Sequence, residues 1–149
     1  MKYKKFNKTF QLVAIKGTSD FASFGSVVPK AAQQFLVRVD EIDHRSGTEI
    51  AIFEPKLGEY HLEGSFYVGM TVNETMTETP PGMDYIELHH EYVTTRGNIR
   101  NIASLHQQLL NWSIEQGYKR NLDTYIVETY HPLENGTEEV EIYLPIHSQ

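Results

Sequence analysis

The sequence predicts an α+β domain built from two pseudo-symmetric units, each with the order strand, helix, strand, strand. Two segments carry apolar residues at helical spacing, and short runs of β-branched and aromatic residues flank both. A Pro-Pro-Gly break at residues 80–82 separates the two sets. Such units form a mostly antiparallel sheet with two helices on one face. We expect one domain over residues 1–149, with halves at about 1–78 and 83–149.

In the first half, a strand pattern at residues 9–16 precedes the first helix pattern. Ser26 suits the N-cap of this helix, and Pro29 suits its first turn, where a missing N–H costs nothing. Further strand patterns follow at residues 49–54 and 65–74. The apolar face of the predicted helix consists of Val28, Ala31, Ala32, Phe35, Val39 and Ile42.

In the second half, Asn98 is the expected N-cap of a helix that ends at Gly117, a residue type favoured just after a helix. The dipeptide Asn135-Gly136 between the last two strand patterns is a strong hairpin signal. The three strand patterns of this half cover residues 85–95, 125–131 and 138–146.

Charge and composition limit the possible partners. The formal net charge is −7, from 20 acidic and 13 basic residues, so direct nucleic-acid binding is not expected and cationic partners are favoured. The apolar runs are too short to span a bilayer, and no apolar segment follows the basic N-terminus as in a secretory signal. With no cysteine either, we expect a cytoplasmic protein without a membrane association.

The strand pattern from Tyr125 to Tyr130 contains one carboxylate, Glu128, among β-branched and aromatic residues. Glutamate is depleted in strands, and strand alternation places Glu128 on the same face as Ile126 and Tyr130. Such an acid is either a solvated charge on the outer face of a sheet or an anion placed for a function.

Short motifs, in their order and spacing, resemble the GyrI-like superfamily, the effector-binding domains of bacterial AraC- and MerR-type multidrug regulators and their stand-alone relatives. The region from Phe53 through the strand Tyr67–Val72 resembles the branch of integron-cassette effector-binding proteins. The motifs of the second half are Pro80-Pro81-Gly82-Met83, Gly97, Leu110-Asn111-Trp112, Gln116-Gly117-Tyr118, Val127-Glu128-Thr129-Tyr130 and Val140-Glu141-Ile142-Tyr143-Leu144-Pro145-Ile146.

This resemblance implies a stand-alone small-molecule effector-binding protein, with an aromatic pocket on the sheet face opposite the helices. Its ligands would be cationic or amphipathic, lipophilic, drug-like molecules, and the acid of the family's Glu-x-Tyr motif carries over to Glu128 at the pocket floor. A cation over an aromatic face gains ~0.5–2 kcal/mol. The carboxylate also attracts the cation by its negative charge, so affinity should fall as the glutamate protonates in acid.

Aromatic residues are the other candidates for the pocket lining. Each has a plainer explanation as well, because Tyr92 shares its face with core residues, Phe53 is of a type that mostly packs, and Trp112 lies at the edge of a helical apolar face. His106 falls within that face, which favours a core role over a pocket role. The ligand-binding candidates are Glu128, Tyr130, Tyr143, Tyr92, Phe53 and Trp112.

No cofactor and no metal site is expected. His89 and His90 are adjacent in a strand pattern, so their rings point to opposite faces, and no His-Glu-x-x-His, phosphate loop or dinucleotide motif occurs. Two alternatives to simple ligand binding remain. The resemblance also permits a hydrolase of cyclopropane-bearing electrophilic natural products with Glu128 as the catalytic residue, or a protein-interaction module for a transcription regulator or gyrase.

Overall fold

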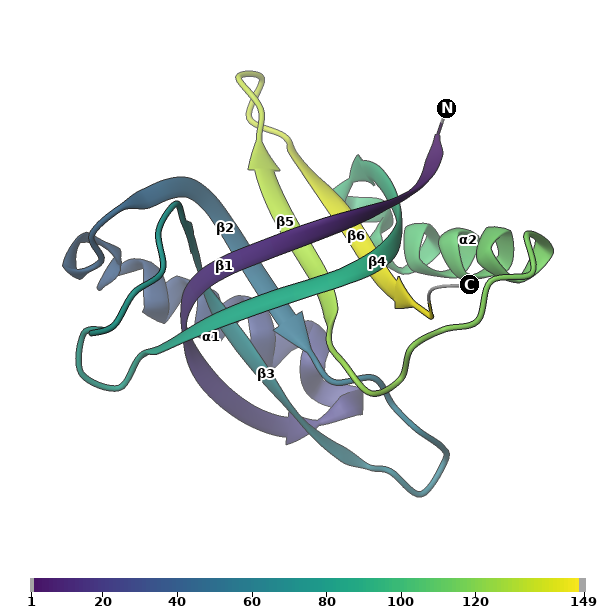
Figure 1. Cartoon of the computed structure of the whole chain (residues 1–149), viewed down its shortest axis with the longest axis horizontal. Coiled ribbons are helices and arrows are strands. Elements are labelled where there is room, and N and C mark those ends of the chain that lie inside the picture. The colour runs from purple at the N-terminus through teal and green to yellow at the C-terminus, as the bar shows by residue number, and fades with distance from the viewer. Residues whose placement is uncertain (1, 148–149) are drawn as a thin grey trace.

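Six antiparallel strands form one closed barrel, with two helices packed on its outside (Figure 1). The computed structural model describes residues 2–147. The strand order around the barrel is β1-β3-β2-β5-β6-β4. The strands are β1 (Tyr3–Asp20), β2 (Arg45–Phe53), β3 (Glu63–Val72), β4 (Asp84–Asn98), β5 (Ile126–Pro132) and β6 (Glu138–Ile146), and the helices are α1 (Phe24–Leu36) and α2 (Ile102–Glu115).

The two halves of the chain have the same order of elements, as the sequence predicts. The first half contributes β1, α1, β2 and β3, and the second contributes β4, α2, β5 and β6. They meet at two strand pairs, β2 with β5 and β1 with β4. Within residues 2–147, neither helix is long and apolar enough to cross a membrane.

β1 is far longer than the sequence pattern indicates and β4 is slightly longer, and the pairing of these two strands closes the barrel. β1 pairs with β4 from Tyr3 to Ala14 and with β3 from Leu12 to Asp20. The lysines at positions 4, 5 and 8 hide its first half from a search for apolar runs. Because one long strand bends from one neighbour to the other, the sheet rolls up.

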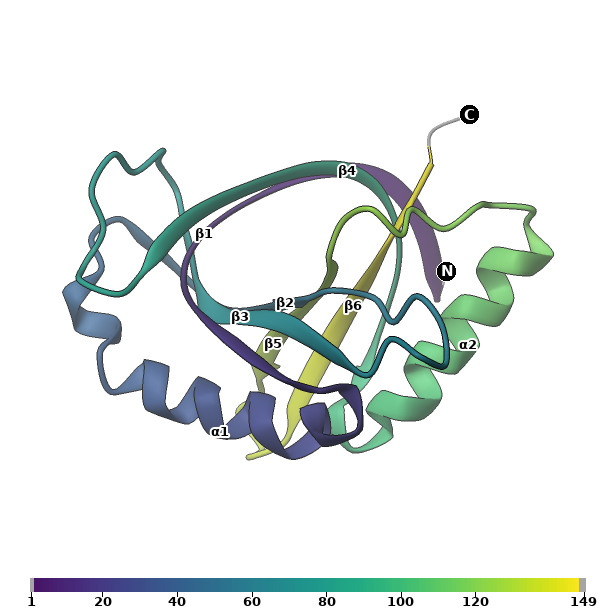
Figure 2. The ribbon, with the colours of Figure 1, turned by 90° about the horizontal axis from the view of Figure 1, so that it is seen from below.

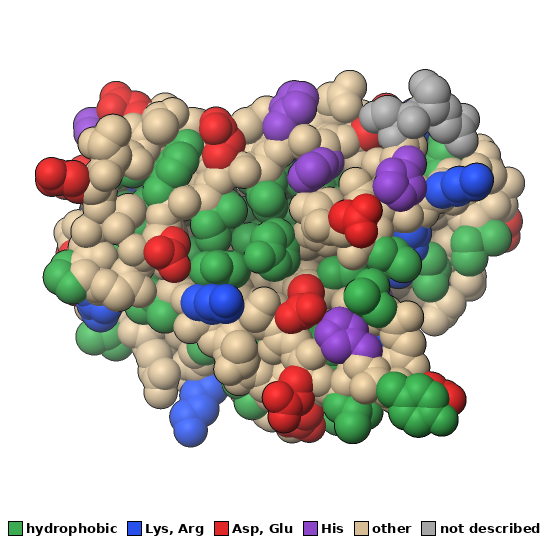
Figure 3. Space-filling model, turned by 60° about the horizontal axis from the view of Figure 1, so that its bottom comes forward, with side chains coloured by type: hydrophobic (Ala, Val, Ile, Leu, Met, Phe, Trp, Pro, Cys, Tyr) green, Lys and Arg blue, Asp and Glu red, His purple; other side chains and the backbone are tan. Residues whose placement is uncertain are grey.

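Closure encloses the second face of the sheet. That face is the barrel interior, where Phe10, Tyr92 and Tyr143 pack edge to face with ring centroids 4.9–6.0 Å apart. Aromatic side chains fill the middle of this side, where the sequence predicts a ligand pocket, and Phe10 and Tyr143 also line a cavity. At the surface, Figure 3 shows hydrophobic side chains gathered near the middle of one face, with scattered Lys and Arg side chains around them.

The helices cover the outer face of the barrel in two clusters. α1 packs on Val13, Phe66 and Val68, while α2 packs on Val93 and Ile142. Figure 2 shows that the N-terminal ends of the two helices lie next to each other, and that the helices diverge from there.

The local signals at the ends of α1 and α2 have different outcomes. Asn98 caps the turn before α2, accepting a hydrogen bond from the backbone N–H of Arg100 at 2.9 Å, and Gly117 has φ +80 just after the helix. α1 begins at Phe24, with Ser23 as its N-cap, so the predicted cap at Ser26 is wrong and Pro29 lies inside the helix. A 3-10 turn at Phe21–Ser23 starts the helical path earlier than the apolar face indicates.

We expect Gly69→Ala to destabilise the fold by about 1–3 kcal/mol, because overpacking forces the backbone to shift. A Cβ at this position of β3 would collide with the carbonyl oxygen of Val13 and lie 2.6 Å from the Cβ of Ala14. Gly25→Ala is the control, since no atom lies within 4 Å of its Cβ position in α1. Urea unfolding of both variants measures the effect, and equal stabilities would contradict it.

Candidate functional site

A cavity of about 490 Å³ lies on the outside of the barrel, between the N-terminal halves of α1 and α2. Strands β2, β5 and β6 supply its three carboxylates and the rings of Phe53 and Tyr130, and the helices supply its mostly apolar walls together with Phe24 and His106. No lysine or arginine is among the lining residues within positions 2–147. The lining consists of Phe24, Gly25, Val28, Pro29, Ala32, Gln33, Glu49, Phe53, Ile99, Ile102, Ala103, His106, Glu128, Tyr130 and Glu138.

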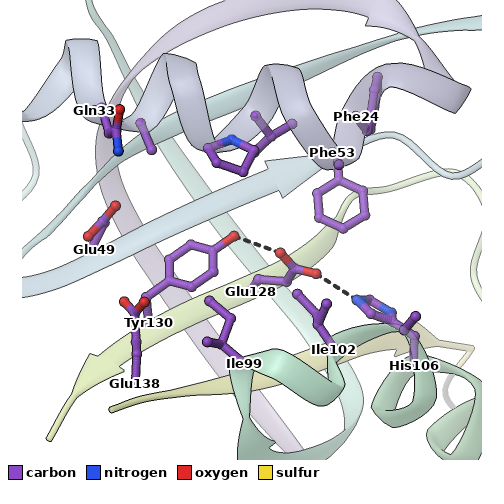
Figure 4. A pocket seen from close by; sticks show the side chains of 15 residues that line it. Phe24, Gln33, Glu49, Phe53, Ile99, Ile102, His106, Glu128, Tyr130 and Glu138 are labelled. Atoms are coloured by element: carbon purple, nitrogen blue, oxygen red, sulfur yellow. Dashed lines mark hydrogen bonds and ion pairs between the residues drawn. The ribbon is translucent and has the colours of Figure 1, made fainter. Parts of the chain in front are cut away.

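Glu128 is the buried acid of this cavity. Its neighbours across the strands are Ala51 and Ile142, both in the apolar layer beneath the helices, and Glu128 itself is 6% exposed. The Tyr130 hydroxyl donates to Oε1 of Glu128 at 2.6 Å, and Nε2 of His106 lies 2.6 Å from Oε2 (Figure 4). An ionised carboxylate only accepts hydrogen bonds, so His106 donates from Nε2.

These contacts hold the carboxylate in one orientation. Charge-assisted hydrogen bonds are short and about twice as strong as neutral ones. Burial, followed by the charge of Glu128, raises the pKa of Tyr130 well above its ordinary value, so its hydroxyl stays a donor. With one donor on each oxygen, Glu128 is an oriented anion in an apolar cavity.

Two further carboxylates, Glu49 and Glu138, lie on the other side of the Tyr130 ring (Figure 4). Glu49 on β2 pairs directly with Tyr130 across the strands, and Glu138 begins β6. Burial, with a smaller contribution from the charge of Glu138, raises the pKa of Glu49. Within residues 2–147, neither side chain makes a hydrogen bond or an ion pair.

Of the six residues predicted to bind ligand, the structure brings three to this cavity: Glu128, Tyr130 and Phe53. Tyr92 and Tyr143 are inside the barrel instead. Strand register explains this, because Glu128 pairs with Ile142 and therefore shares its outward face, whereas Tyr143 points inward.

Tyr143 and Trp112 have other surroundings. Tyr143 lines a separate cavity of about 280 Å³, together with Thr129, His131 and other polar residues. Trp112 stacks on Tyr3, with ring centroids 5.2 Å apart, and belongs to the cluster beneath α2. Packing, which the sequence also allowed for Trp112, is thus its observed role.

His106 has the less favoured of its two predicted roles. It lines the cavity and contacts Glu128, rather than filling the core, and its side chain is 27% exposed. His106 lies one helical turn past Ile102, which also lines the cavity, so both side chains share one face of α2.

Sequence reasoning missed the wall residues of both helices and the acids Glu49 and Glu138. Glu49 carries the same signal as Glu128, since it is a carboxylate at the start of an apolar strand run. Among the described residues, no three His, Asp or Glu side chains are grouped as metal ligands.

We expect Glu49→Gln to stabilise the empty protein by on the order of 0.5 kcal/mol, or roughly 1–2 °C in Tm. A raised pKa means that the folded state disfavours the ionised carboxyl, so ionisation of Glu49 costs stability above that pKa. The gain should be present at neutral pH and shrink in acid, where wild-type Glu49 is protonated too. Thermal unfolding across pH measures it, and a Tm loss at neutral pH would contradict it.

Solved structures share this fold across almost the whole chain. SAV2435, whose structure is bound to tetraphenylphosphonium, is 14% identical with a TM-score of 0.72, covering 99% of this chain and 95% of its own. The integron cassette protein VCH_CASS2, from the mobile metagenome of Vibrio cholerae, is 11% identical with a TM-score of 0.67, covering 98% and 96%.

The third similar structure is part of a larger protein. EcmrR, in its complex with DNA, is 14% identical with a TM-score of 0.68; the match covers 100% of this chain but 59% of EcmrR. No protein-family model and no curated protein matches the sequence. At these identities the shared property is the fold, and the chain has the GyrI-like fold that its motifs predict.

Proposed function

We propose that this protein binds lipophilic organic cations in the cavity between α1 and α2, and that Glu128 selects positive charge. The observation that carries the proposal is a buried, oriented carboxylate in a cavity with apolar helical walls and, among the described lining residues, no lysine or arginine. The tetraphenylphosphonium bound by SAV2435, which has the same fold, supports this ligand class.

The physical basis is a division of roles among the lining residues. The rings of Tyr130 and Phe53 and the aliphatic walls bury apolar parts of a ligand, which is favourable by about 25 cal/mol per Å². The carboxylate of Glu128 attracts a positive centre and repels a negative one. Neither contribution requires a fixed hydrogen-bond pattern, so such a site accepts ligands of varied shape but of one charge.

His106 can compete with the ligand for the carboxylate of Glu128. When its imidazole is protonated it is a cation 2.6 Å from Oε2 of Glu128, and it neutralises the charge that a ligand would use. When it is neutral, it only orients the carboxylate. Protonation of Glu128 in acid removes the same attraction, so both titrations change affinity in the same direction.

Tetraphenylphosphonium and tetraphenylborate have matched shapes and opposite charges, so they separate charge selection from hydrophobic binding. We expect isothermal titration calorimetry to detect binding of the cation only. Glu128→Gln should weaken cation binding by about tenfold or more, corresponding to ~1.4 kcal/mol. Glu115→Gln, an exposed acid on α2, makes the same change in net charge and should leave affinity unchanged. Equal binding of both ions would refute the proposal.

Affinity for the cation should fall as pH decreases, because added protons remove negative charge from the cavity or add positive charge to it. The titratable groups at the cavity are Glu128, His106, Tyr130, Glu49 and Glu138. His106→Gln keeps an N–H donor without a positive charge, so this variant should bind more tightly than wild type at mildly acidic pH and similarly at basic pH. Titrations at several pH values test this, and parallel pH profiles would show that His106 does not compete.

The His106–Glu128 pair also favours a second candidate function, hydrolysis of an electrophilic ligand. A carboxylate that accepts from Nε2 orients the imidazole for general-base catalysis at Nδ1, which makes no hydrogen bond within residues 2–147. As the water oxygen bonds to the electrophilic cyclopropane carbon, the ring C–C bond at that carbon would break, its electron pair would pass to the ligand's conjugated electron-withdrawing group, and the water's proton would pass to Nδ1. His106 is the better-placed base because both oxygens of Glu128 already accept hydrogen bonds.

Incubation with a cyclopropane-bearing electrophile, followed by mass spectrometry, distinguishes hydrolysis from binding. A hydrolase should form the water adduct faster than buffer does, and His106→Gln should abolish that rate while still binding tetraphenylphosphonium at basic pH. Product formation at the buffer rate would leave binding as the function.

A further inference from the structure

We propose that the cavity has two cation subsites and takes an extended dication, with two positive groups joined by an apolar linker. The inner subsite is the carboxylate of Glu128, and the outer subsite is the pair Glu49 and Glu138. This inference rests on the proposed function and names the ligand class more narrowly.

The outer carboxylates are the acids of the cavity that have no partner. Glu128 accepts hydrogen bonds on both oxygens, from Tyr130 and His106. In contrast, Glu49 and Glu138 make no side-chain hydrogen bond or ion pair within residues 2–147. Two partly buried carboxylates that repel each other lower the stability of the fold, and a cation placed between them would remove this repulsion.

One cavity contains the inner acid and the outer pair, because all three acids line the same space as the apolar side chains of both helices. The outer pair is therefore more than a solvated acidic edge. The amide of Gln33 on α1 lies near Glu49 on this side (Figure 4), while Phe53 and His106 lie at the inner end. A ligand that reaches both ends fills the length of the cavity.

Tyr130 separates the two subsites. It pairs with Glu49 across the strands and lies two positions from Glu128 on β5, which places the backbone of the two acids roughly 7 Å apart along the strands. Its ring lies between the acids, with its hydroxyl directed at Glu128 (Figure 4). A ligand's apolar linker can lie along this ring while each positive end meets a carboxylate.

The apolar side of the linker path comes from the helices. On one side of the cavity are Val28 and Pro29 of α1. On the other side are Ile99, in the turn before α2, and Ile102, the first residue of α2. A linker with donors or acceptors would lose hydrogen bonds to water there without replacement. An alkyl or aromatic linker therefore fits, and a hydroxylated or amide linker does not.

Linking two positive groups converts the second contact into an intramolecular event, which raises affinity only when the linker spans both subsites. A monocation of the same apolar length meets one subsite at a time. The preference for a dication should thus depend on linker length and pass through a maximum.

The test compares α,ω-bis(trimethylammonium) alkanes of increasing length with alkyltrimethylammonium ions of the same chain lengths. Calorimetry is run on wild type, on Glu49→Gln/Glu138→Gln, and on Glu115→Gln/Glu134→Gln. The last variant removes two exposed acids that do not line the cavity, so it controls for net charge. Far-ultraviolet circular dichroism and Tm confirm that each variant is folded.

In wild type, the best dication should bind about tenfold or more tightly than its matched monocation. This preference should fall to less than about threefold in Glu49→Gln/Glu138→Gln, while monocation affinity changes little and the exposed-acid variant behaves as wild type. Equal affinity for both ligands at every length, or an equal loss for both in the outer-pair variant, would overturn the inference. If tetraphenylphosphonium still binds in that case, the proposed function stands; if no cation binds, both fail.

Discussion

Pairing of β1 with β4 is the constraint on which the rest of the structure depends. It joins the two halves of the chain at their outer strands and converts an open antiparallel sheet into a barrel. Once the sheet is closed, one of its faces is enclosed and must be filled with side chains. Phe10, Tyr92 and Tyr143 pack there, and the cavity that contains Glu128 is on the outside, between the helices.

The position of the helices then determines the chemistry of that space. Each helix packs its apolar face on its own part of the barrel, and the two diverge from their neighbouring N-terminal ends. The strands exposed between them, β2 and β5, present their outward residues to a cavity with apolar walls. A carboxylate on this face is removed from water, so it needs partners, and Glu128 has them in Tyr130 and His106.

The three acids of the cavity differ in their hydrogen-bond partners. Glu128 is neutralised in part by the donors around it, which orient it and moderate its charge. Glu49 and Glu138 carry charge that the described part of the chain does not balance. For the proposed dication, the two positive groups would have to match both the number and the spacing of these anions.

Local sequence determined the element order, the helix-ending Gly117, the cap at Asn98 and the unusual place of Glu128 in a strand, since each depends on neighbours along the chain. Only the tertiary structure decided which face of the sheet borders the cavity that contains Glu128. The residue order cannot show whether an antiparallel sheet stays open or closes, or which residues of β6 lie beside Glu128, because both depend on pairing between distant strands. A shift of one residue in that register would exchange Ile142 for Tyr143 beside the acid. For the same reason His106, Glu49 and Glu138 join the site only after β2, β5, β6 and α2 are assembled around one cavity.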